Sequence, residues 1–173
     1  MPQLPRCPGC PYGGKAIASR GRVDSRLVLV GEAPGAREIE CEEPFRGAAG
    51  RVLSGAIEAA GLHEEELLIV NAIACRPQPV RPTVAAIDSC RGRLMGELHE
   101  RPRAVVVTLG ATPLRAVAED KTPVLRAREG APIRLGSWLI MPSVHPAWVL
   151  RWKTERFRLL VADLDRARRL SGL

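Results

Sequence analysis

The chain has 173 residues, of which 46% are hydrophobic and 26% charged, and its net charge is +7. Chains of this length bury roughly 70% of their unfolded surface, so the composition excludes a miniature fold that depends on disulfides. No apolar run approaches the ~20 residues that cross a bilayer, and the Pro- and Gly-rich N-terminus lacks the apolar segment of a signal peptide. We therefore expect a cytoplasmic protein without membrane contacts.

Apolar strands and amphipathic helices alternate along the chain. They are predicted, in order, as strand 26–31, helix 51–61, strand 67–71, a helix from Pro82 to 100, strand 103–110, helix 111–120, paired strands 132–135 and 137–144, and a basic helix near 153–170. This alternation is typical of a parallel sheet with helices on both faces. Because no linker or repeat interrupts it, we expect residues 1–173 to form one domain.

Positive charge is concentrated at the two ends of the chain. Residues 1–26 and residues 151–173 each carry a net charge of +4, which leaves the middle near neutrality. Basic ends favour a polyanionic partner such as nucleic acid, because Arg and Lys contacts to phosphates release counterions. Solubility alone is the competing explanation of the same charge.

Polar residues follow several of the predicted strands. The first strand runs into a Gly-rich loop at 31–50, the second ends on Asn71, and the last leads to His145. Ligands of open parallel sheets bind beyond the carboxyl ends of the strands, so these segments are expected to meet at one edge. Individually, an Asn at a strand end is more often a cap, and an isolated His is more often structural.

The loop after the first strand contains GEAPG at 31–35, whose glycines allow the backbone to approach a ligand closely. It matches neither the dinucleotide nor the nucleoside triphosphate fingerprint. Phe45 follows in a polar, Gly-flanked stretch of a chain that has six aromatic residues. Such a ring is well placed to stack on a planar base, although it could also fold back as a loop anchor.

Cys7 and Cys10 form a CxxC pair, and Cys75 and Cys90 follow at a distance, with Cys41 in addition. Thiolates two residues apart can bind the same metal, as in zinc ribbons and iron–sulfur sites. A ribbon requires a second CxxC, which is absent here. Spacing alone leaves open a cluster-binding set or a lone CxxC with unrelated thiols elsewhere.

Together these motifs resemble the family 4 uracil-DNA glycosylases, the iron–sulfur branch of the uracil-DNA glycosylase superfamily. The resemblance rests on GEAPGxxE at 31–38, PFxGxAG at 44–50, NxxxCRP at 71–77, the cysteine pattern, and HPAWVLR at 145–151, in order over nearly the whole chain. It implies a three-layer α/β/α sandwich with a short, mostly parallel central sheet. It also implies a [4Fe-4S] cluster with a structural role, ligated by Cys7, Cys10, Cys75 and Cys90.

The resemblance further implies excision of uracil from single- or double-stranded DNA by a monomer. Phe45 would stack on the extruded base, Asn71 would bind its N3–H and O4, and Glu38 would occupy the space of a thymine methyl group. Glu32, Ala33 and Pro34 would form the pocket floor. His145 would donate a hydrogen bond to O2 as negative charge develops there. Glu32 and Asn71 are the candidates for positioning the attacking water.

The segment after His145 is expected to contact the DNA. Val149, Leu150 and Arg151 would belong to a loop that enters the minor groove, with Leu150 or Arg151 as the wedge that helps to extrude the base. The basic terminal helix would contact phosphates. Ordinary packing at a helix start is an equally good explanation of Trp148, Val149 and Leu150.

Some residues depart from the family pattern. Ile39 replaces an Asp, Glu42 a Gly, and Ala74 a Lys, and the Glu-rich stretch at 40–43 makes this part of the loop acidic. We refer to residues 40–43 as the acidic lip. An acidic lip near phosphates suggests the alternative of a catalytically weak or altered-specificity iron–sulfur protein that binds DNA and senses damage.

Overall fold

The computed structural model describes residue 12 and residues 14–77, 81–151 and 154–173. Six strands form one sheet in the order β1-β3-β2-β4-β6-β5. The strands are β1 (Arg20–Gly21), β2 (Leu27–Gly31), β3 (Leu68–Asn71), β4 (Val105–Leu109), β5 (Ile133–Leu135) and β6 (Trp138–Ser143). The central four run parallel, and the edge strands β1 and β5 are antiparallel to their neighbours. The expected mostly parallel sheet is thereby confirmed.

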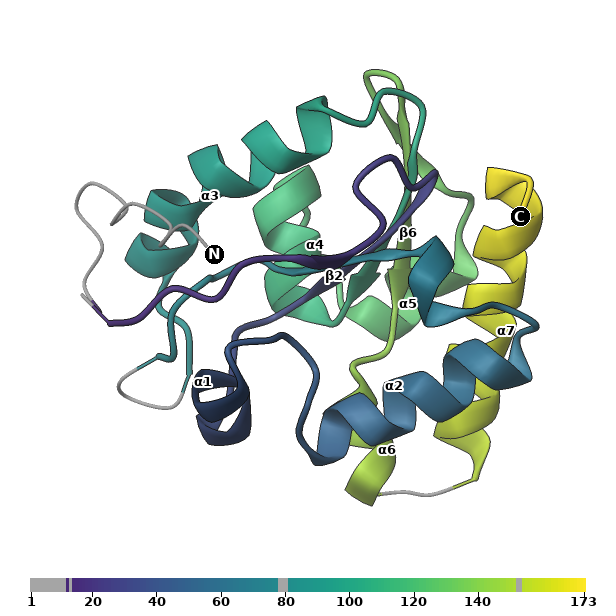
Figure 1. The fold of residues 1–173 in the computed structure, drawn as a ribbon. Helices are drawn as coiled ribbons and strands as arrows, with labels where there is room; N and C mark the ends of the chain where they lie inside the picture. Colours follow the sequence, from purple (N-terminus) through teal and green to yellow (C-terminus); the bar gives the residue numbers. More distant parts are fainter. Residues whose placement is uncertain (1–11, 13, 78–80, 152–153) are drawn as a thin grey trace.

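Helices cover both faces of this sheet (Figure 1). The helices are α1 (Ala36–Cys41), α2 (Ala48–Ala59), η1 (Glu64–Glu66), α3 (Val84–His99), α4 (Ala111–Ala118), α5 (Val124–Glu129), α6 (Pro146–Arg151) and α7 (Glu155–Ser171). No helix in the described ranges is long and apolar enough to span a membrane.

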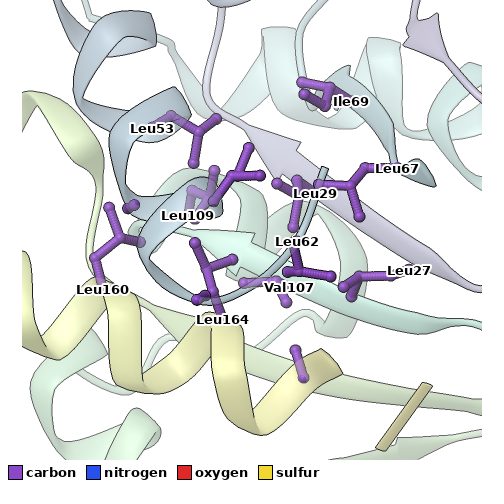
Figure 2. Close-up of a cluster of buried hydrophobic side chains, with 14 of the residues drawn as sticks. Leu27, Leu29, Leu53, Leu62, Leu67, Ile69, Val107, Leu109, Leu160 and Leu164 are labelled. Atoms are coloured by element: carbon purple, nitrogen blue, oxygen red, sulfur yellow. The ribbon is translucent and has the colours of Figure 1, made fainter. Parts of the chain in front are cut away.

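The two faces of each central strand belong to two separate apolar cores. In β2, Leu27 and Leu29 pack with α2 and α7, whereas Val28 and Val30 pack with α3 and α4. Side chains of a strand alternate between its faces, so a continuously apolar strand supplies both cores. Figure 2 shows the first core, where Leu160 and Leu164 of α7 lie against the strand side chains. These layers form the α/β/α sandwich.

Most boundaries lie close to the predicted ones, and the differences have local causes. The helix predicted from Pro82 begins at Val84, because Thr83 is its N-cap and accepts a hydrogen bond from the N–H of Ala86 at 3.2 Å. The segment after His145, expected as a loop, is the short helix α6. Helices α1 and α5 form where loops were expected.

Candidate active site

The carboxyl ends of the parallel strands meet at one edge of the sheet, as expected. Asn71 is the last residue of β3 and pairs in register with Gly31, the last residue of β2. His145 follows β6, and Gly110 follows β4. Residues that are far apart in sequence therefore converge beyond one sheet edge.

A pocket of about 220 Å³ lies at this edge. Its walls come from the loop after β2, from the start of α2 and from the two strand ends, and consist of Ala33, Gly35, Glu38, Phe45, Gly47, Ala48, Ala49, Asn71 and His145. Five residues expected to bind the base, Ala33, Glu38, Phe45, Asn71 and His145, are among them. Glu32 and Pro34, expected at the floor, are absent from this lining.

Phe45 is held against the end of β2 by close contacts. A Cβ atom at Gly31 would lie 2.4 Å from Cε2 of Phe45 and 2.5 Å from Oδ1 of Asn71. A Cβ atom at Gly50 would lie 1.9 Å from the Phe45 carbonyl oxygen. Phe45 itself adopts a φ of 58°, which is strained for an aromatic residue. The loop therefore adopts a strained backbone conformation at Phe45, which places the ring in the pocket wall.

His145 lies near this ring, with 6.2 Å between the centroids and 31° between the planes. The N–H of Ala147 donates to Nδ1 of His145 at 3.1 Å, so the neutral ring carries its proton on Nε2. Burial lowers the pKa of His145 below its ordinary value, and the Glu32 carboxylate partly opposes this shift. The imidazole is thus neutral near pH 7, with Nε2–H as its donor.

Glu32 directly follows β2, and a hydrogen bond from α4 fixes its carboxylate. The hydroxyl of Thr112, in the first turn of α4, donates to Oε2 of Glu32 at 2.7 Å. The Glu32 carboxylate raises the pKa of His145, against the larger effect of burial, which lowers it. Glu32 therefore lies beside the pocket as an electrostatic partner of His145.

Glu38 joins two segments of the pocket wall. Its Oε2 accepts from the N–H of Gly35 at 3.1 Å, and its Oε1 accepts from the N–H of Gly47 at 2.8 Å. Gly35 and Gly47 are the N-caps of α1 and α2, where a negative charge is favourable to both helices. Hydrogen bonds to both oxygens fix the carboxylate in the wall of the pocket.

Sequence reasoning missed Arg93, which holds the backbone at Asn71. Nη2 of Arg93 donates to the carbonyl oxygens of Asn71 at 2.6 Å and Ala72 at 3.1 Å, and its Nη1 pairs with Glu97. Arg93, Glu97 and Cys90 lie on one face of α3, three and four residues apart. In the sequence, an Arg and a Glu four residues apart next to apolar residues could have indicated a buried ion pair at this place.

The residues expected at the DNA have different environments. Val149 is 4% exposed and packs in the core, so its side chain does not reach the surface. Leu150 is 43% exposed. The side chain of Arg151 lies outside the described part of the chain. Trp148 packs partly against the core, and the Arg156 guanidinium lies 3.2 Å from its ring centroid. Of the expected wedge residues with described side chains, Leu150 is the one that projects.

The terminal helix α7 presents only its beginning to the site. It starts beside α6 and runs toward the opposite edge of the sheet (Figure 1). At its end, a Cβ atom on Gly172 would lie 3.4 Å from the guanidinium of Arg26, which precedes β2. Arg168 and Arg169 also pair with Asp165. The expected contacts of this basic helix with phosphates stay a prediction.

The acidic lip is largely neutralised by cations of the same region. Glu40 pairs with Arg37, Glu42 with Lys15, and Glu43 with Arg46. These are exposed pairs that contribute little to stability, but they offset the negative charge beside the pocket. These pairs weaken the support that the acidic lip gave to the alternative of a weak DNA-binding protein.

Two of the four expected cluster ligands are described. Cys75 and Cys90 are both buried, whereas Cys41 is exposed. Cys7 and Cys10 lie outside the described residues, and within the described ones no three His, Cys, Asp or Glu side chains gather as a metal site.

The chain just after Cys10 is attached to both described cysteine segments. Ala16 forms a β-bridge with Cys75, and the N–H of Ile17 donates to the Ala74 carbonyl at 2.8 Å. The Tyr12 hydroxyl accepts from the N–H of Thr83, at the start of the helix that carries Cys90, at 2.8 Å. The described residues that follow Cys10 therefore contact the segment that carries Cys75 and the start of α3.

Comparison with known proteins gives an independent assignment. Residues 18–165 match the family model of the uracil DNA glycosylase superfamily. The chain is 31% identical over 172 residues to a type-4 uracil-DNA glycosylase of Thermotoga maritima, covering 96% of this chain and 90% of that protein. It is 26% identical to the type-4 uracil-DNA glycosylase of Sulfurisphaera tokodaii, with 96% and 79% covered. The match to the same enzyme of Pyrobaculum aerophilum is 31% identical and covers 66% and 59%. Together with the pocket and its residues, these matches show that the chain belongs to the type-4 family of the uracil DNA glycosylase superfamily.

Proposed function

We propose that this protein is a monofunctional uracil-DNA glycosylase that extrudes uracil from DNA and hydrolyses its N-glycosidic bond, leaving an abasic site. The observation that carries the proposal is the pocket itself, in which an aromatic ring, a strand-end amide and a neutral imidazole face a space of about 220 Å³. Such a combination suits a small, planar, uncharged ring with polar edges. The type-4 relatives support the same conclusion by name.

Base selection follows from the chemistry of the pocket wall. The Asn71 side chain accepts a hydrogen bond from N3–H of uracil and donates one to O4, and cytosine presents the opposite pattern at these positions. Phe45 stacks on the ring. The carboxylate of Glu38, fixed by the N–H groups of Gly35 and Gly47, takes the space of a 5-methyl group and disfavours thymine. Ala33 lines the pocket, and Pro34, the next residue, is buried.

Cleavage breaks the bond between C1′ of the sugar and N1 of uracil, whose electron pair leaves with the base. His145 stabilises the uracil anion by donating Nε2–H to O2, and the burial that keeps the ring neutral avoids a proton transfer. A water adds to C1′ and loses its proton to the medium. Glu32 and Asn71 are the candidates for orienting this water, and Glu32 is supported by its fixed position beside His145.

In this proposal the protein acts on DNA as a monomer. Leu150, which is 43% exposed, or Arg151 enters the minor groove as the wedge, and the basic helix α7 supplies phosphate contacts. Residues 1–173 form one domain, supported by a single sheet that contains every strand of the described ranges. The substrate, chromosomal DNA, places the activity in the cytoplasm.

Cys7, Cys10, Cys75 and Cys90 bind a [4Fe-4S] cluster in this proposal. The described residues fit it, because Cys75 and Cys90 are buried, Ala16 forms a β-bridge with Cys75, and Tyr12 binds the start of the helix that carries Cys90. Thiolate ligation supplies a structural crosslink between the N-terminal segment, the loop after Asn71 and α3. The Arg93 contact to the Asn71 carbonyl links that helix to the pocket.

Incubation with an oligonucleotide that contains one uracil tests this function. Alkali breaks the strand at the abasic site that the enzyme leaves, so we expect a single product after alkali and no break without it. Oligonucleotides with thymine or cytosine at the same position serve as controls. Salt-dependent DNA binding without abasic sites would instead support a damage-sensing protein that lacks the glycosylase activity.

A further inference from the structure

A buried ion pair lies behind the strand that leads to His145. Nε of Arg128 in α5 donates to Oδ2 of Asp163 in α7 at 3.0 Å, and Nη2 donates to Oδ1 at 2.8 Å. The two side chains are 12% and 8% exposed. This bidentate geometry is the strongest arrangement of an Arg with a carboxylate. It joins two helices that are distant in sequence.

Asp163 also holds the end of β6. Its Oδ2 accepts a hydrogen bond from the hydroxyl of Ser143 at 2.7 Å, and Ser143 is fully buried. Ser143 is the last residue of β6 and lies two positions before His145. Its carbonyl oxygen accepts from the N–H of Gly110 at 2.9 Å. Both the side chain and the backbone of Ser143 are therefore fixed just before the chain turns to His145.

Gly110 extends this support to the imidazole. It adopts a φ of +107°, and a Cβ atom on it would lie 3.2 Å from Cβ and 3.6 Å from Cδ2 of His145. The ring of His145 thus packs directly on the Gly110 backbone, which the Ser143 carbonyl holds in place. A continuous set of contacts runs from Asp163 through Ser143 and Gly110 to His145.

Arg128 also holds α5, the second element that lies next to His145. It lies in α5, whose start at Pro123, Val124 and Leu125 faces His145 and Trp148 across an apolar cleft of about 350 Å³. The residues of α5 are partly buried or exposed, and none is fully buried. The Arg128 ion pair joins this short helix to α7 by two hydrogen bonds.

Stability alone does not explain this network. A buried ion pair loses the hydration of both charges, and well-packed apolar residues of similar size are often at least as stabilising. What polar groups add is direction, because hydrogen bonds fix atoms along defined lines. The network lies behind His145, whose imidazole must be oriented to donate its hydrogen bond to the leaving base.

We propose that Asp163 is a positioning residue for His145, acting through the Ser143 hydroxyl and held in place by Arg128. The inference rests on the proposed function, in which His145 donates to the leaving uracil. Misplacing a catalytic group by about 1 Å can cost a factor on the order of 10² in rate. Loss of the Ser143 hydroxyl removes the hydrogen bond to Asp163 that fixes the chain just before His145. It therefore lowers the rate of the chemical step more than it weakens DNA binding.

The Ser143→Ala variant of the full chain tests this, because it leaves the Arg128–Asp163 pair intact. We expect kcat for uracil release to fall on the order of 10- to 100-fold, with KM changed by less than about twofold. Ser143→Thr retains a hydroxyl and restores most of the rate. Ser25→Ala is the matched control: Ser25 is an equally buried serine whose hydroxyl binds the Leu27 and Glu66 carbonyls at the other end of β2. It leaves kcat unchanged.

A second readout separates positioning from folding. In ¹⁵N-histidine NMR spectra, Ser143→Ala shifts the His145 imidazole signals, and Ser25→Ala does not. A normal kcat and an unshifted His145 in folded Ser143→Ala overturn the inference. If His145→Ala itself retains full activity, the proposed role of His145 fails, while a shifted imidazole in Ser143→Ala still supports the structural link from Ser143.

Discussion

The backbone N–H of Ala147 donates a hydrogen bond to Nδ1 of His145 at 3.1 Å. Because Nδ1 is the acceptor, the proton of the neutral ring is on Nε2, the other ring nitrogen. Ala147 lies in the first turn of α6, so helix formation after Pro146 fixes the tautomer. The local fold therefore chooses the chemical form of the residue that stabilises the leaving base.

Replacing His145 with Ala removes this donor. We expect the single-turnover rate of uracil release to fall by about 10²–10³, since one preorganised donor to a developing anion contributes about this much. His99→Ala is the matched control, because His99 is exposed and packs edge-on against Trp138. Similar rates for both variants, within about threefold of wild type, would refute the role of His145.

The pH dependence follows from the lowered pKa of His145. Its ordinary pKa is about 6.5, so the unfolded chain takes up a proton at a higher pH than the folded protein does. The stabilisation that comes from the neutral buried ring is complete above about pH 6.5 and declines as the pH falls below it. The rate of uracil release should behave differently. Because the ring of the folded protein stays neutral somewhat below pH 6.5, the rate should keep its plateau value there.

Two measurements check the sign of this effect. Urea denaturation of wild type and His145→Gln between about pH 5 and pH 7 should show a larger loss of unfolding free energy for the wild type on acidification. Glu32→Gln removes the carboxylate that favours the protonated ring, so the NMR titration of His145 should move to lower pH. A shift to higher pH would contradict the electrostatic link between Glu32 and His145.

The close packing at Gly50 predicts a sharp effect of one methyl group. In Gly50→Ala the new Cβ would lie 1.9 Å from the Phe45 carbonyl, so the ring must leave its place in the pocket wall. We expect at least a 10-fold loss of kcat/KM, in the range of a lost stacking contact of about 1–3 kcal/mol. Gly55→Ala, in the same helix, meets no atom within 4 Å and should stabilise the protein by about 0.4–1 kcal/mol.

The cysteines give a prediction that is independent of catalysis. Cys75→Ser and Cys90→Ser should each lose bound iron and the visible absorption of an iron–sulfur cluster, and should unfold at lower temperature. Cys41→Ser is the control, because this thiol is exposed on the acidic lip. Colourless protein that contains zinc after anaerobic purification would exclude the cluster, and full iron content in Cys90→Ser would exclude that ligand.

The central fold is predictable from sequence because its strands are unbroken apolar runs between helices with apolar faces. Short elements carry no such signal. Helix α1 buries only Glu38, and α5 buries no residue, so neither shows a periodic stripe. Each is held by a charged group that binds elsewhere in the fold: Glu38 to Gly47, and Arg128 to Asp163.

The edge of the sheet that carries the site follows from parallel topology, which brings Asn71 and His145 together. Their supporting residues do not follow from it. Arg93 reaches the Asn71 carbonyl across 22 residues, and Asp163 reaches Ser143 across 20. Such contacts depend on how helices pack on the sheet, which side-chain patterns do not specify. Val149 shows the converse, because its place beside Leu150 suggested DNA contact whereas helix α6 turns it into the core.

The most direct test identifies the base that the protein releases. Duplex oligonucleotides that each contain one uracil, thymine or cytosine in the same position are incubated with the protein, and the free bases are separated by chromatography. The pocket predicts free uracil in an amount equal to the abasic sites formed, no thymine or cytosine, and strongly reduced release by Asn71→Ala. Uracil that stays in the DNA, with a protein that is folded and holds its metal, would contradict the assignment of this pocket.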